Sequence, residues 1–206
     1  MPSFRAPFIP LAQIRAEADA FREKYWAEKS VPVDVMGIVE FDLQMEIRPV
    51  AGMREELDVD AVLLGDMQTL VVDLGHYMDD RMQNRLRYSV AHEIGHKVLH
   101  ADIYRAAGVA SAEEWLHWFQ SIPDDQYSWL EQHAHEFAGR LLVPPERLMS
   151  ELAGAVERAR QTGFVSWDSS GDAAREYIAS SICRVFGVSS QVIEKRIDRE
   201  RFWPPG

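Results

Sequence analysis

Residues Tyr88–His100 read YSVAHEIGHKVLH, and the remainder of the chain is expected to hold this stretch in place. It contains His92 and His96 four residues apart, with Glu93 directly after the first histidine. In an α-helix, residues i and i+4 lie on one face, so the two imidazoles can bind one metal ion. Glu93 is rotated by about 100° from His92, close enough to address a water held by that metal. Two neutral imidazoles and a carboxylate suit tetrahedral zinc, with one position left for water.

Hydrophobic periodicity predicts that this stretch is helical, from about Met82 to His100. Val90, Ile94 and Val98 form a core stripe at four-residue steps. The histidines of the motif form a second stripe, about 200° around the helix from the first. One face of the helix is therefore expected to pack and the other to carry chemistry.

The composition is that of a folded, acidic protein. Of the 206 residues, 47% are hydrophobic and 27% are charged, which excludes a globally disordered chain. The net charge of −11 argues against sequence-independent binding of a nucleic-acid phosphate backbone, so direct DNA binding is not expected. The single cysteine, Cys183, excludes an intrachain disulfide and a cysteine-rich zinc module. The chain shows no signal-peptide layout and no apolar run of about 18 residues, so a cytoplasmic protein without membrane contact is expected.

Before the motif helix, the pattern predicts two helices and a small antiparallel sheet of about three strands. The helices are expected at residues 10–29 and 33–41, and the strands at 45–50, 61–64 and 69–74. The last two strands flank Gly65 and Asp66, which is typical of a hairpin. After the motif helix the chain is expected to be mostly helical, with a loop of small and polar residues at 163–172.

A second helix, about 35 residues after the motif, offers the missing ligand. It is expected from residue 128 to the Pro144-Pro145 pair, and Glu131 and His135 form another i, i+4 pair on it. The simplest metal site consists of His92, His96 and Glu131. The core stripe of this second helix has helical spacing and comprises Leu130, Ala134, Phe137 and Leu141.

Two residues near the end of the motif helix are weaker ligand candidates. A metzincin site needs a glycine that turns the chain out of the helix before its third histidine, and Leu99 occupies that position here. The helix therefore runs on, which makes Asp102 a poor ligand. His100 is expected to point away from a site shared by the other two histidines, as a polar residue at the helix end.

A short aromatic helix follows, capped by Ser111 with Glu114 three residues later. Its Trp115 and Trp118 have two possible roles. They can be buried against the domain, or they can form a substrate rim beside the motif helix.

At this point the sequence resembles the ImmA/IrrE-type metallopeptidases of bacteria and their mobile elements. Arg87–His100 is similar to the family's R-F-x-x-A-H-E-x-G-H-x-x-L-H, and Glu131–Pro144 to E-x-E-A-N-x-F-A-x-x-L-L-x-P. Phe186–Ser189, with Arg196-Ile197, is similar to the family's closing F-G-V-S segment. The resemblance runs from about residue 18 to residue 197.

The resemblance implies an α+β fold with a zincin-like core, the small sheet, the HExxH helix and a mostly helical C-terminal half. It divides the chain into a metallopeptidase domain at residues 1–150 and a helical region at 151–206 packed on it. A segment at about 178–197 resembles a helix-turn-helix, for which a packing or docking role is expected. The implied activity is that of a zinc endopeptidase of narrow specificity. Its implied partner is an XRE-type helix-turn-helix repressor, in a stress or mobile-element response.

Two positions depart from the family pattern: His133 replaces a glutamate, and His135 replaces an asparagine or aspartate. In such sites the first glutamate binds zinc, and the residue four later orients a zinc-bound histidine. His135 can do this by accepting a hydrogen bond, or it can compete as a ligand. We expect Glu131 to be the ligand and His133 to be solvated.

The mechanism that the motif predicts is hydrolysis by water, with Glu93 taking the proton as water attacks a peptide carbonyl. Two other classes stay open. One is a non-catalytic regulatory protein with a structural zinc site, and the other is a hydrolase of small molecules. The presence of Glu93 favours an enzyme, because a structural site has no need of a carboxylate beside the metal.

Overall fold

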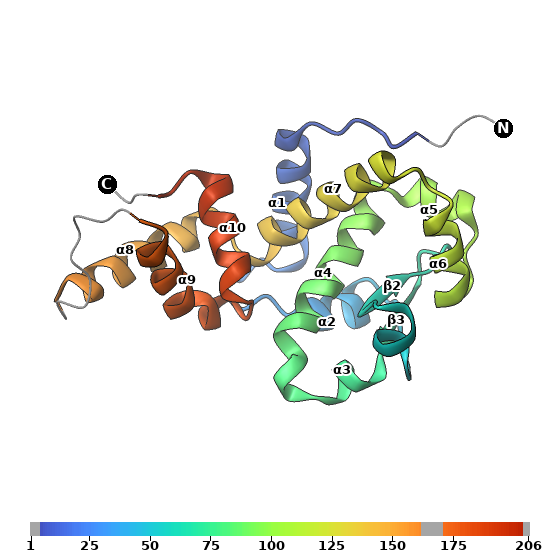
Figure 1. Cartoon of the computed structure of the whole chain (residues 1–206), viewed down its shortest axis with the longest axis horizontal. Helices are drawn as coiled ribbons and strands as arrows, with labels where there is room; N and C mark the ends of the chain where they lie inside the picture. Colours follow the sequence, from blue (N-terminus) through green and yellow to red (C-terminus); the bar gives the residue numbers. More distant parts are fainter. Residues whose placement is uncertain (1–4, 162–170, 204–206) are drawn as a thin grey trace.

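The computed structural model describes residues 5–161 and 171–203, so all but the end of the loop expected at 163–172 lies outside the described residues (Figure 1). The first half contains α1 (Leu11–Tyr25), α2 (Val35–Gly37), the π-helical turn η1 (Ile38–Asp42), β1 (Glu46–Val50), a second π-helical turn η2 (Met53–Leu57), β2 (Ala61–Leu63) and β3 (Thr69–Asp73). Next come α3 (Leu74–Met78), the 3₁₀ turn η3 (Asp80–Met82) and the motif helix α4 (Gln83–Leu99). The second half contains α5 (Ala101–Ala107), α6 (Ala112–Gln120), α7 (Asp124–Leu142), α8 (Pro145–Gln161), α9 (Asp172–Phe186) and α10 (Ser190–Glu200).

The sheet is mixed rather than antiparallel, which corrects the prediction. Its strand order is β1-β3-β2; β2 and β3 form the expected antiparallel hairpin, whereas β1 pairs with β3 in parallel, with Glu46 opposite Thr69. The hairpin reverses the chain, so β3 runs opposite to β2 and in the same direction as β1. Strand β3 is the central strand of the sheet. All five residues of β3 are buried, as a central strand requires, while Pro49 lies in an edge strand, where a missing N–H is tolerated.

The helix ends follow from local sequence. Ser111 begins α6 by accepting a hydrogen bond from the N–H of Glu114, as predicted. Ser189 caps α10 in the same way through the N–H of Val192. Between α9 and α10, Gly187 adopts a φ of 61°, the left-handed conformation that ends a helix and that glycine adopts without strain.

Helices α4 and α7 pack against each other at the middle of the molecule (Figure 1). Helices α8, α9 and α10 gather at one end in this view, and the sheet lies at the other end with α5 and α6. The predicted core stripe of α7 is buried, as are Val90 and Ile94 of α4. One cluster of buried apolar residues extends from Ile14 of α1 to Ile197 of α10. Helix α8 passes without a break through residue 150; the division of the chain at that residue stays a prediction.

Within residues 5–161 and 171–203, no helix has both the length and the apolar character that crossing a membrane requires.

A buried ionic cluster fastens α10 to α7 and α1. Glu136 of α7 accepts from Arg196 of α10 at 2.9 Å and from Arg15 of α1 at 2.7 Å. The side chains of Glu136 and Arg196 are only 4% and 3% exposed. Arg196 also pairs with Glu200. Because these charges are desolvated, each depends on its partners.

Replacing Glu136 by Ala should therefore lower the free energy of unfolding by about 3–5 kcal/mol, the cost of leaving a buried charge unpaired. Chemical denaturation of the metal-free protein measures this loss. Glu23→Ala, at an exposed position of α1, is the matched control and should change stability by about 0.5 kcal/mol or less. Equal small losses in both variants would show that the cluster contributes little.

Candidate metal centre

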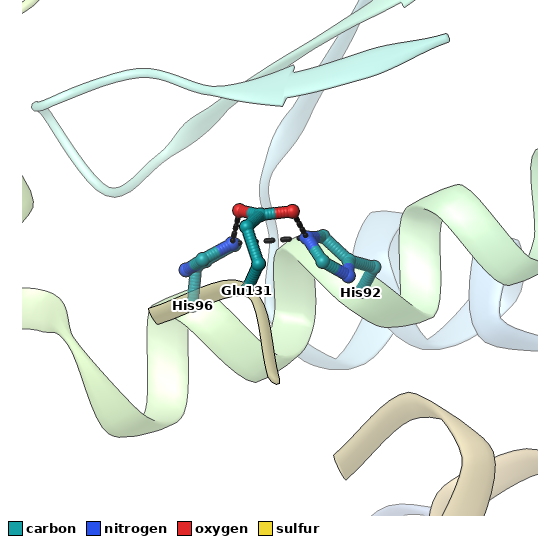
Figure 2. Close-up of side chains that lie close together, drawn as sticks. All are labelled: His92, His96 and Glu131. Carbon is teal, nitrogen blue, oxygen red and sulfur yellow. Dashed lines mark hydrogen bonds and ion pairs between the residues drawn. The ribbon is translucent and has the colours of Figure 1, made fainter. Parts of the chain in front are cut away.

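Helix α4 presents His92 and His96 on one face, one turn apart (Figure 2). Both side chains are buried, at 8% and 2% exposure, and their Nε2 atoms lie 3.0 Å apart. The two histidines therefore point the same ring nitrogen at a common point.

Helix α7, which packs against α4, brings Glu131 to that point. Its carboxylate oxygens lie 3.3 Å from Nε2 of His92 and 3.2 Å from Nε2 of His96 (Figure 2). The approach depends on Gly95, between the two histidines. A Cβ at this position would lie 3.1 Å from Cα of Ala134, so a larger residue would push α7 and its glutamate away.

This donor set fits a tetrahedral zinc ion. The ligand atoms of His92, His96 and Glu131 all lie within 4.8 Å of one another. Bonds of about 2.0–2.1 Å in tetrahedral geometry separate neighbouring ligand atoms by about 3.3 Å, and the three contacts here measure 3.0–3.3 Å. Although burial opposes ionisation, hydrogen bonds from the two histidines hold the pKa of Glu131 well below its ordinary value, so this candidate ligand is an anion.

Glu93 is buried beside this group and lies under the edge strand β2. The N–H of Leu63 donates to its Oε2 at 2.8 Å, which fixes the carboxylate and leaves the other oxygen free to accept a proton. Burial raises the pKa of Glu93, although His96 and His92 oppose the shift. A raised pKa is the direction that suits a general base.

His135 contacts His92 through the ring nitrogen of His92 that lies away from the candidate ligand atoms. Its Nδ1 lies 3.2 Å from Nδ1 of His92, the nitrogen that points away from the metal position. The hydroxyl of Tyr88 lies 3.2 Å from the same atom of His135. This geometry matches the orienting role that the sequence left open, and the role itself stays a prediction.

The structure corrects one expectation about the other histidines. His133 is buried, at 3% exposure, and not solvated. His100 is the C-cap of α4, at the helix end as expected, and is equally buried, at 2%. Its Nδ1 lies 3.0 Å from Nδ1 of His96, and its Nε2 lies 3.2 Å from Nδ1 of His133. The polar character of His133 predicted exposure, but the close packing of α4 on α7 encloses its ring.

Two further candidates lie apart from the ligand group. Asp102 is fully exposed on α5, where it pairs with Arg105. Trp118 packs edge-on against Tyr104, with ring centroids 5.2 Å apart. Trp115, by contrast, lines the cavity that contains the metal centre.

That cavity has a volume of about 280 Å³. Beside the predicted residues it is lined by Tyr88 and Tyr127, which sequence reasoning missed. Each tyrosine precedes a predicted ligand, His92 or Glu131, by four residues, so helical spacing could have identified both. Burial raises the pKa of Tyr88 to about 12, so its hydroxyl keeps its proton at neutral pH and remains a donor.

Residues 76–198 match the family described as the IrrE N-terminal-like domain, peptidase family M78. The chain belongs to this family. The matched segment covers more than half of the 206 residues and includes α4, α7 and most of α10, so the whole ligand group lies inside it. No curated protein matches the chain.

Membership confirms the predicted resemblance and the α+β zincin-like fold, and it makes the chain a metallopeptidase by family. The identity of the metal, the roles of individual residues and the substrate stay predictions.

Proposed function

We propose that the chain is a zinc-dependent endopeptidase of narrow specificity that cuts an XRE-type helix-turn-helix repressor in a stress or mobile-element response. The observation that carries the zinc and peptidase part is the meeting of His92, His96 and Glu131 at one point, with Glu93 beside them in an accessible cavity. The repressor is proposed from the family resemblance alone.

His92, His96 and Glu131 would hold the ion. When bound, zinc supplies a Lewis acid that polarises a carbonyl and makes water more acidic. The proton transfers are assigned to Glu93. The free oxygen of Glu93 takes a proton from the attacking water as the water oxygen bonds to the carbonyl carbon. Glu93 then gives that proton to the amine nitrogen as the C–N bond breaks.

A groove extends from the metal centre along α10. Two more cavities, of about 560 and 360 Å³, adjoin the first, and Tyr88 and His135 line all three. Val192 and Lys195 of α10 line both of the additional cavities. Three cavities that share lining residues suit an extended peptide better than a small molecule, which supports a peptidase over the small-molecule hydrolase.

The groove favours an acidic segment, although the whole chain carries a net charge of −11. The 560 Å³ part is lined by three cationic side chains, Arg81, Arg85 and Lys195, and a single carboxylate, Asp60. Arg81 and Arg85 pair with Asp79 and Asp60. Lys195 is exposed and makes no ion pair or hydrogen bond with any residue in the described parts of the chain.

Lys195→Glu should therefore reduce cleavage beside acidic residues by about 5–10-fold, equivalent to about 1 kcal/mol for an exposed charge. The measurement is the composition around cleaved bonds in a peptide library prepared from a bacterial proteome. Lys24→Glu, on α1 and outside the groove, should leave the profile of the wild type unchanged. An unchanged profile in Lys195→Glu would contradict an acidic preference set by this residue.

The function itself is tested by incubating the zinc-loaded protein with any XRE-type repressor encoded beside its gene. We expect one or a few defined cuts, identified by mass spectrometry of the products. An intact repressor, bound tightly but uncut, would favour the alternative of a non-catalytic regulatory protein.

A further inference from the structure

Three buried histidines stand in a row behind the metal centre. His96 contacts His100 through their Nδ1 atoms at 3.0 Å, and Nε2 of His100 contacts Nδ1 of His133 at 3.2 Å. His100 and His133 are 2% and 3% exposed, and neither belongs to the group of ligand atoms. Zinc-binding histidines usually donate their second nitrogen to a carboxylate, a carbonyl or water. Here that partner is another imidazole, that of His100.

The position of the metal determines every hydrogen in this row. If Nε2 of His96 offers its lone pair to zinc, the hydrogen of that neutral ring lies on Nδ1. Nδ1 of His100 must then accept, which places the hydrogen of His100 on Nε2. That hydrogen is donated to Nδ1 of His133, which must also be an acceptor. Each hydrogen bond in the row is thus donated in the same direction, away from the metal position.

The row also joins the two helices that form the site. His96 and His100 lie on α4, whereas His133 lies on α7, two residues after Glu131. The rings of His100 and His133 are nearly parallel, at 26°, with centroids 5.5 Å apart. The structure therefore links α4 and α7 through Glu131 at the ligand atoms and through His133 behind them.

We propose that His100 and His133 are positioning residues that fix the tautomer and ring orientation of His96, and thereby raise the affinity of the site for zinc. This inference rests on the proposed zinc site. It adds two residues that never touch the metal, and it gives His100 the larger effect because it contacts His96 directly.

The decisive comparison is between His100→Asn and His100→Gln. The amide oxygen of asparagine can occupy the place of Nδ1 and accept from His96, whereas the amide of glutamine reaches the place of Nε2 and serves only His133. We expect zinc affinity, measured by competition with a chromophoric chelator, to fall about 10–100-fold in His100→Gln and only a few-fold in His100→Asn. Equal affinities in the two variants would overturn the proposal.

A second arm tests the outer residue. His133→Leu should weaken zinc binding by less than His100→Leu, and the double variant should bind zinc no more weakly than His100→Leu alone, because His133 acts through His100. Additive losses of zinc affinity in the double variant would contradict the proposal that His133 acts through His100. His117→Leu, on the exposed surface of α6, is the matched control. If a leucine variant fails to fold, the zinc affinities of His100→Asn and His100→Gln still test the proposal.

The zinc measurement separates this proposal from the proposed function. A wild-type protein that binds zinc but cuts no repressor contradicts the function and leaves the row of histidines testable by affinity. A wild-type protein that binds no zinc overturns both.

Discussion

Glu93→Gln should lower the rate of peptide cleavage by about 10²–10⁴-fold, the usual contribution of a positioned general base, and should leave the zinc content unchanged. The amide oxygen of glutamine can still accept from the N–H of Leu63, which donates to Glu93 at 2.8 Å in the wild type. The fold and the ligand group should therefore survive, and only the ability to take a proton is lost. The measurement pairs initial cleavage rates with metal analysis of the same samples.

The matched control is Glu113→Gln, an exposed glutamate on α6, which should cleave at the wild-type rate. Cleavage by Glu93→Gln within a few-fold of the wild type would refute Glu93 as the base. Loss of zinc from the same variant would instead show that Glu93 holds the site together, as in a structural centre.

Glu131→Ala has the second large effect, on metal binding. It removes one of three ligand side chains, and the only one that carries a negative charge, so affinity should fall by more than the 10–100-fold typical of a lost supporting residue. Zinc bound per chain after dialysis against a chelator measures the loss. Gln132→Ala, the exposed neighbour on α7, should retain the metal.

Full zinc retention in Glu131→Ala would assign the third ligand to another residue. His135 is the alternative that the sequence suggests, but its Nδ1 faces the outer nitrogen of His92 at 3.2 Å. His135→Ala should accordingly weaken zinc binding less than Glu131→Ala.

The sequence was sufficient to predict the parts of the site that depend on spacing along one helix. An i, i+4 pair fixes which face a residue shares, so His92 with His96, and the buried stripe that includes Phe137, were predictable. The hairpin of β2 and β3 was also predictable, because its turn residues lie between two apolar runs.

What depends on contacts between distant elements was not predictable. The parallel pairing of β1 with β3 joins strands separated by β2 in the sequence. The burial of His133 arises because Gly95 lets α7 approach α4 closely, which encloses a polar side chain that periodicity alone would leave in solvent. Helical spacing identifies the face of a residue, but not the neighbour that covers it.

The most direct test of the central claim is the dependence of cleavage on added zinc. Wild-type protein stripped with a chelator should not cut its substrate, and the rate should rise in proportion to added zinc until each chain holds one ion. Cleavage at the full rate by stripped protein would contradict a zinc peptidase built on His92, His96 and Glu131.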